Sequence, residues 1–155
     1  MLIDTHSHID MENFETRFDE VIQKAKDYGV EKIVIPGVEP KGFERIACLC
    51  EKYQNVYGAV GVHPEEVNSF DEEAQELMKQ YLKSPKIIAV GEIGLDYYWD
   101  KSQVELQKEI FEKQILIAKE AGKPVLVHDR EAHLDSFEIL KKTKANEVGV
   151  VMHCF

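Results

Sequence analysis

Short runs rich in valine and isoleucine alternate along the whole chain with segments whose apolar residues recur at helical spacing. The strand-like runs cover residues 2–9, 30–35, 56–62, 87–90, 125–128 and 148–153. Strands with little polar alternation are typical of a parallel sheet that is covered by helices on both faces. The alternation therefore predicts an α/β fold with six strands and five helices.

Five segments between these strands carry the apolar spacing of an amphipathic helix. The longest runs from about Ser102 to Ala121, with Ser102 as the predicted N-cap and Gly122 with Pro124 as the stop. The other four are marked by Phe14, Phe18, Val21, Ile22 and Ala25; by Phe43, Ile46, Ala47 and Cys50; by Ala74, Leu77, Met78 and Tyr81; and by Leu134, Phe137 and Leu140.

The chain length separates two architectures that share this alternation. An eight-unit barrel needs roughly 250 residues, whereas this chain has 155. An open, doubly wound sheet suits the length better, but no glycine-rich phosphate loop follows the first strand. We expect one domain over residues 1–155, with no linker and no low-complexity segment.

Charge and cysteine content limit the functional classes. The net charge of −10 argues against a broad basic surface for wrapping nucleic acid, but not against a nucleic-acid substrate if metal ions supply positive charge. Three cysteines, an odd number, indicate free thiols in a reducing cytosol. With no membrane-length apolar run and no signal peptide, we expect a cytoplasmic location and no membrane partner.

Five of the six histidines fall at the ends of predicted strands, where active sites form in parallel α/β folds. Imidazoles around a shared carboxylate suit a pair of divalent ions, which generate hydroxide and stabilise an in-line displacement. His6 and His8, two apart on the predicted first strand, share a face with Asp4. The other strand-end residues are His63, Glu92, His128 and His153.

Each of these residues also has a structural interpretation. His63 precedes Pro64 and is typical of a turn. Glu92 needs a partner when buried and has a candidate in Arg130. Arg130 is placed to hold a phosphate by a bidentate pair of hydrogen bonds, or to form a surface pair with Asp135 or Glu131. Asp96 is a candidate turn cap, and His133, inside the fifth helix, is expected to be structural or solvent-facing.

Four sequence blocks resemble the TatD family of metal-dependent deoxyribonucleases, in the amidohydrolase-like barrel superfamily. They are residues 2–10 (LIDTHSHID), 61–64 (GVHP), 91–96 (GEIGLD) and 124–135 (PVLVHDREAHLD). Residues 151–155 (VMHCF) resemble a fifth block. Together the blocks span the whole chain.

The resemblance implies a TIM (β/α)₈-type barrel, incomplete here, with two divalent metal ions of the class Mg, Mn, Zn or Co. It implies that His6, His8 and Glu92 hold one ion, and that Glu92, His128 and His153 hold the other. His63 and Arg130 would contact the scissile phosphate, with Asp4 and Asp96 orienting ligands. The implied activity is hydrolysis of DNA phosphodiesters, 3′–5′ exonuclease-like, on single strands or 3′ ends.

Two departures from the family pattern bear on activity. The family usually has a histidine where this chain has Glu65, and an aspartate after an eighth strand that this chain does not reach. Two other hypotheses remain: a hydrolase of another ester or amide bond, such as D-aminoacyl-tRNA, and an inactive truncated homologue. Exposed barrel edges would favour self-association.

Overall fold

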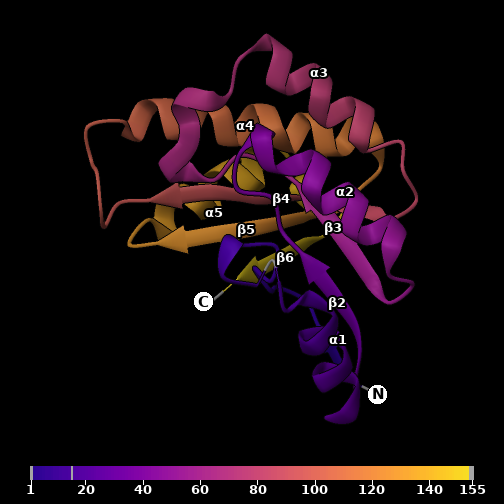
Figure 1. Ribbon diagram of the computed structural model, residues 1–155. Coiled ribbons are helices and arrows are strands. Elements are labelled where there is room, and N and C mark those ends of the chain that lie inside the picture. Colours follow the sequence, from indigo (N-terminus) through magenta and orange to yellow (C-terminus); the bar gives the residue numbers. More distant parts are fainter. Residues whose placement is uncertain (1, 15, 154–155) are drawn as a thin grey trace.

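Six parallel strands form one curled sheet, with helices along its outer side (Figure 1). The computed structural model describes residues 2–14 and 16–153. The strands follow chain order from β1 to β6, so each pairs with its sequence neighbours. Their bounds are β1 Leu2–Asp4, β2 Val30–Ile35, β3 Val56–Val60, β4 Ile87–Asp96, β5 Val125–Arg130 and β6 Val150–His153.

The helices occupy the crossovers between strands, as the alternation predicts. Gly122 ends the longest helix in the left-handed conformation, with φ +63°. The α-helices are α1 Phe18–Asp27, α2 Phe43–Lys52, α3 Glu72–Tyr81, α4 Val104–Ala121 and α5 His133–Lys142, and short 3₁₀ segments cover Glu12–Phe14, Pro40–Gly42, Pro64–Ser69 and Ala145–Glu147.

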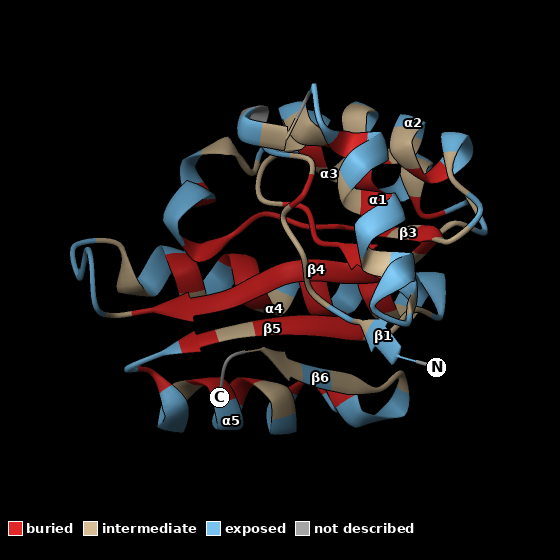
Figure 2. Ribbon diagram, turned by 60° about the horizontal axis from the view of Figure 1, so that its bottom comes forward, coloured by how far each residue is buried: buried red, intermediate tan, exposed pale blue. Residues whose placement is uncertain are grey.

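Apolar side chains are buried on both faces of the central strands (Figure 2). On β2, Ile33 and Ile35 belong to the main core, whereas Val34 packs in a second, smaller cluster with Ala59 and Leu126. The strands also follow chain order without the reversal that a doubly wound sheet has, and the sheet curls, so the six strands form part of a barrel. The predicted incomplete TIM-type barrel is confirmed, and the open-sheet alternative is wrong.

Several element boundaries differ from the predictions. Strand β1 ends at Asp4, so His6 and His8 lie in the segment after it and not on a strand. Strand β4 continues six residues beyond the predicted end at Val90. Helix α4 begins at Val104, and Ser102 is not its N-cap because Gln103 occupies that position without a side-chain cap.

The fifth helix also differs from its prediction, because two of its marker residues face solvent. Leu134 is 74% exposed and Phe137 is 59% exposed. Val151 on the edge strand β6 is exposed too. Burying an apolar helix stripe needs a neighbouring element, and the described part of the chain provides none on this side of α5. Self-association through the sheet edges stays a prediction.

Three further expectations concern the thiols and membrane spans. Cys48 is exposed and Cys50 is buried, and both are free thiols. Cys154 lies outside the described residues. Within the helices of the described chain, none is both long enough and apolar enough to cross a membrane.

Candidate metal centre

Glu92 lies at the centre of the site, on β4 and almost completely buried. The register of β4 against β5 shifts between Val90 and Ile93, which inserts an extra residue there, and such bulges re-aim side chains beside active sites. The strand is also fastened to the end of β2. The Glu92 N–H donates to Gly37 O (2.8 Å), and the Gly37 N–H donates to Gly91 O (2.9 Å).

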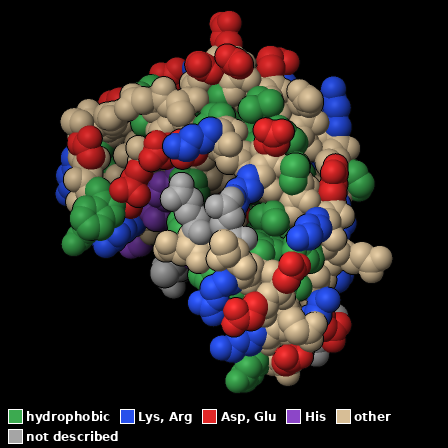
Figure 3. Space-filling model, in the orientation of Figure 1, with side chains coloured by type: hydrophobic (Ala, Val, Ile, Leu, Met, Phe, Trp, Pro, Cys, Tyr) green, Lys and Arg blue, Asp and Glu red, His purple; other side chains and the backbone are tan. Residues whose placement is uncertain are grey.

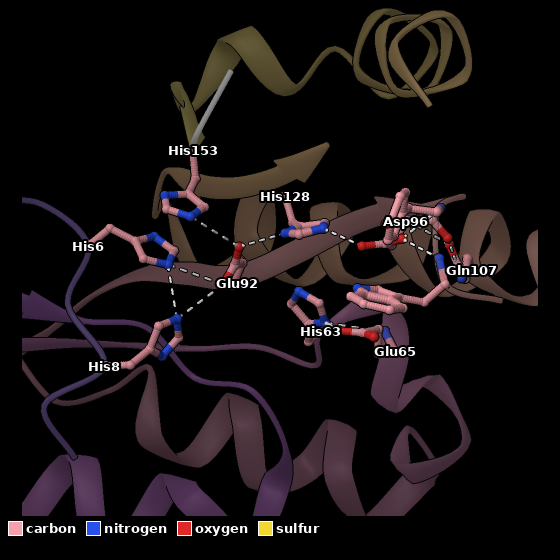
Figure 4. Close-up of polar contacts among 11 residues, drawn as sticks. His6, His8, His63, Glu65, Glu92, Asp96, Gln107, His128 and His153 are labelled. Atoms are coloured by element: carbon pink, nitrogen blue, oxygen red, sulfur yellow. Dashed lines mark hydrogen bonds and ion pairs between the residues drawn. The ribbon is translucent and has the colours of Figure 1, made fainter. Parts of the chain in front are cut away.

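Each carboxylate oxygen of Glu92 faces its own pair of histidines (Figure 4). Oε2 lies 3.2 Å from His6 Nε2 and 3.5 Å from His8 Nε2. Oε1 lies 3.0 Å from His128 Nδ1 and 4.0 Å from His153 Nε2. The four imidazoles come from the segment after β1 and from the ends of β5 and β6, so the curl of the sheet brings them together.

The spacing of these atoms fits divalent cations. His6 Nε2 and His8 Nε2 are 3.2 Å apart, so with Glu92 Oε2 they form a triangle with sides of 3.2 to 3.5 Å. Tetrahedral ligands bound at about 2.0–2.1 Å are separated by roughly 3.3 Å. Two three-residue groups, sharing Glu92, also have ligand atoms close enough for one ion: His6, Glu92 and His153; and His63, Glu92 and His128.

The pairing of histidines in these groups differs from the one that the family resemblance implies. His153 lies with His6, and their rings stack 3.4 Å apart between centroids. His63 lies with His128, edge to face at 4.4 Å. The predicted residues therefore meet in one cluster, while their division between two ions stays a prediction.

The electrostatics of Glu92 and His128 favour an ionised carboxylate. Burial alone raises the pKa of Glu92, but hydrogen bonds with His128, His6 and His8 outweigh it and hold this pKa well below the ordinary value. Burial lowers the pKa of His128, yet its bonds to Glu92 and Asp96 raise it overall. A buried, negatively charged carboxylate among imidazoles is the donor chemistry that a divalent cation requires.

Both predicted supporting aspartates contact the cluster through named hydrogen bonds. Asp96 Oδ2 lies 2.9 Å from His128 Nε2, while Asp96 Oδ1 accepts the N–H groups of Tyr98 (2.9 Å) and Trp99 (3.3 Å). Asp96 is therefore a turn cap and a histidine partner at once. Asp4 Oδ1 accepts the His6 N–H at 3.1 Å, which orders the turn after β1.

His63 is buried just after β3, directly before the 3₁₀ segment Pro64–Ser69, and is in its neutral form. Its Nδ1 accepts the Glu65 N–H at 3.2 Å, so the proton of the neutral ring resides on Nε2. Burial, reinforced by the nearby His128, lowers the pKa of His63 to about 4. Glu65 itself, which replaces the family's histidine, has its carboxylate 3.6 Å from His63 Nδ1.

Arg130 lies beside the cluster and not in it. Its guanidinium carbon is 3.7 Å from the centre of the Tyr98 ring and 5.2 Å from that of Trp99. Glu92 contacts histidines, so the alternative Glu92–Arg130 pair is wrong. Asp135 contacts Lys108 Nζ instead (2.8 Å), and among the described residues neither Asp135 nor Glu131 forms an ion pair with Arg130, so the predicted surface pairs are wrong as well.

His133 is confirmed as solvent-facing. Its side chain is 67% exposed, and its Nδ1 lies 2.9 Å from Asp129 Oδ2. It begins α5 and takes no part in the cluster.

Two glutamines that the sequence interpretation missed hold the strand ends in place. Gln107 Oε1 accepts the Asp96 N–H (2.9 Å), and its Nε2 donates to Asp96 O (3.1 Å). Gln114 makes the same pair of bonds with Val62, at 2.7 and 3.0 Å. The two lie seven residues apart, two turns of α4 on one face. Polar residues on the buried stripe of α4 were the only available signal.

The family model described as "TatD related DNase" matches residues 3–155. The chain belongs to the TatD family. Among TatD-type relatives, a Bacillus subtilis protein named "Uncharacterized metal-dependent hydrolase YabD" is 42% identical over 155 residues, which is all of this chain and 61% of that protein.

Two further relatives are a solved structure and a protein that is named for its activity. The crystal structure of the Escherichia coli TatD homologue YjjV matches with a TM-score of 0.93 and 36% identity, over 99% of this chain and 60% of that one. A protein of Edwardsiella piscicida named "3'-5' ssDNA/RNA exonuclease TatD" is 31% identical over 137 residues, 88% of this chain and 53% of that protein. The chain spans between 53% and 61% of the length of these relatives.

Proposed function

We propose that this chain carries the metal-binding part of a hydrolase that cleaves DNA phosphodiester bonds from single strands or 3′ ends. The observation that supports this most directly is Glu92, whose two oxygens each face a separate pair of histidines at 3.0 to 4.0 Å. A carboxylate with two histidine-lined sides suits a pair of bridged cations, and two-metal sites are typical of nucleases and phosphatases. The exonuclease name of one relative supports the choice of substrate.

His6, His8 and Glu92 would hold one ion, and Glu92 with His128 and His153 would hold the second. Divalent ions bound there supply positive charge for the phosphoryl oxygens and lower the pKa of a bound water. Asp96 orients His128 through the 2.9 Å contact to Nε2, leaving Nδ1 directed at Glu92. The ion set stays Mg, Mn, Zn or Co, because imidazole and carboxylate accept all four.

The remaining two predicted residues act on the substrate. His63 is neutral near pH 7 and its Nε2 carries the proton, so it donates a hydrogen bond to a phosphate oxygen or to the departing alkoxide. The same tautomer makes Nε2 a donor and not a metal ligand. Arg130 presents a planar fork of N–H donors that matches the oxygens of a phosphate.

The test is metal-dependent hydrolysis by the purified chain after chelation and reloading with each ion. A 5′-labelled single-stranded oligonucleotide and a D-aminoacyl-tRNA are supplied in parallel. We expect stepwise shortening of the oligonucleotide from its 3′ end, which Glu92→Gln abolishes. Glu109→Gln, on the exposed face of α4, serves as the matched control and keeps full activity.

Three results would overturn the proposal. Equal activity of wild type and Glu92→Gln would remove the metal centre from the reaction. Cleavage of the D-aminoacyl ester without cleavage of DNA would assign another bond to the site. Binding of metal without turnover of either substrate would identify an inactive homologue.

A further inference from the structure

Two aromatic side chains stand exposed beside the metal centre. Tyr98 is 48% exposed and Trp99 is 64% exposed, and they follow directly on the end of β4. Their rings meet edge to face, with centroids 4.7 Å apart. Figure 3 shows histidine side chains at the surface, bordered by acidic and basic side chains, with an exposed hydrophobic group beyond these at the left edge. Exposed aromatics at the carboxyl ends of barrel strands lie where such folds bind substrate.

Arg130 completes this group, which we call the stacking platform (Tyr98, Trp99 and Arg130). Its guanidinium lies 3.7 Å from the centre of the Tyr98 ring. Within residues 2–14 and 16–153, no carboxylate forms an ion pair with Arg130, so its charge is not neutralised by the acidic surface. A guanidinium on an aromatic face keeps its N–H fork free for an anion.

The side chain of Asp96 connects the backbone of Tyr98 and Trp99 to the metal centre. Asp96 Oδ1 accepts the N–H groups of Tyr98 and Trp99, and Asp96 Oδ2 contacts His128. Arg130 pairs in register with Asp96 and lies two residues beyond His128 on β5, about 6.6 Å along the strand. Arg130 and the ligand His128 therefore share one face of β5, while Tyr98 and Trp99 follow directly on the end of the neighbouring strand β4.

We propose that the platform stacks an unpaired base of a single-stranded polynucleotide, with the adjoining phosphate at the metal centre. The proposal rests on the proposed function and adds to it the residues that would select a strand with unstacked bases. Aromatic rings and arginine planes bind bases through their π-faces, whichever base is present. A paired base, held in its stack, does not offer this face, so the platform would select single strands over duplex.

The chain contains one tryptophan, so its fluorescence reports on the platform directly. Metal-free protein is titrated with a short oligothymidylate and with an abasic strand of equal length and charge. We expect quenching of Trp99 by the thymidylate strand and little change with the abasic strand. Anisotropy of labelled strands should show thymidylate bound about tenfold or more tightly.

Variants separate stacking from charge and from folding. Trp99→Leu should lower thymidylate affinity about tenfold while leaving abasic affinity unchanged, and Trp99→Phe should restore most of it. Tyr28→Leu, a matched change at a tyrosine that is 75% exposed after α1, should alter neither. Equal affinity for both strands, or equal loss of both in Trp99→Leu, would overturn the platform.

Failure of the stacking platform can be distinguished from failure of the proposed hydrolase function. Base-dependent binding without hydrolysis would retain the platform and remove the activity. Metal-dependent hydrolysis with the same kcat/KM on thymidylate and abasic strands would retain the activity and remove the platform.

Discussion

Replacing Gly94 by alanine should disturb the metal centre, because the added methyl group would collide with the backbone of β5 at His128. A methyl group at Gly94 would stand 2.0 Å from the backbone oxygen of His128, and the glycine has φ +146°. The distance between this methyl carbon and the His128 oxygen must increase by about 1 Å, because Cβ atoms essentially never lie closer than 3.0 Å to such an atom. The backbone of His128, opposite Gly94 in the register, must therefore shift, and the position of its imidazole beside Glu92 changes with it.

The expected cost combines overpacking with an unfavourable backbone conformation. Together these come to about 2–5 kcal/mol of the free energy of unfolding. For a chain of this size, that lowers the melting temperature by roughly 5–15 °C. Displacing a metal ligand or its support costs about 10–100-fold in metal affinity.

The assay pairs thermal unfolding of the metal-free protein with calorimetric titration of Zn²⁺ or Mn²⁺. Gly42→Ala is the matched control, because Gly42 has φ −84° and nothing lies within 4 Å of its added methyl. We expect the control to match wild type in both measurements. If Gly94→Ala matched Gly42→Ala in melting temperature and metal affinity, the close approach of the strands would not position the site.

Three other predictions concern α4, the thiols and His63. Gln114→Leu leaves the buried N–H and C=O groups of Val62 without their partners and should lower the free energy of unfolding by about 2–5 kcal/mol. Denaturant unfolding measures this loss, and an unchanged unfolding midpoint would contradict the prediction. Iodoacetamide at pH 8 should label the exposed Cys48 and spare Cys50, since burial raises the Cys50 pKa to about 12; mass spectrometry reads the result, and equal labelling would refute it. With metal removed by a chelator, NMR should show the His63 ring titrating near pH 4. Because this pKa of the folded protein lies below the unfolded value of 6.5, the contribution of His63 to stability declines as the pH falls from 6.5 towards 4. Titration near pH 6.5 would exclude the buried neutral ring.

The sequence predicts those parts of the fold that repeat locally. Strand and helix alternation follows from apolar periodicity, and the strand-end positions of the histidines follow from it in turn. The length of β4 was not predictable, because Gly91, Glu92 and Gly94 interrupt the apolar run at Val90. Those residues continue the strand through a bulge and a close contact with β5, and both depend on a partner strand 35 residues away.

The contacts within the site depend on tertiary structure in the same way. The convergence of His6 and His8 does not come from strand alternation, because β1 ends at Asp4 and its side chain accepts the His6 N–H. The roles of Gln107 and Gln114 depend on which strand ends lie beneath α4, which no local pattern specifies. Leu134 and Phe137 show the converse: their spacing is that of a buried stripe, yet both are exposed.

In the proposed site Glu92 joins two divalent cations, and anomalous diffraction from crystals of the chain loaded with Zn²⁺ or Mn²⁺ would locate them. We expect two anomalous peaks, one on the His6 and His8 side and one on the His128 side, each about 2.0–2.2 Å from a different oxygen of Glu92. A single peak, or peaks that do not contact Glu92, would contradict it.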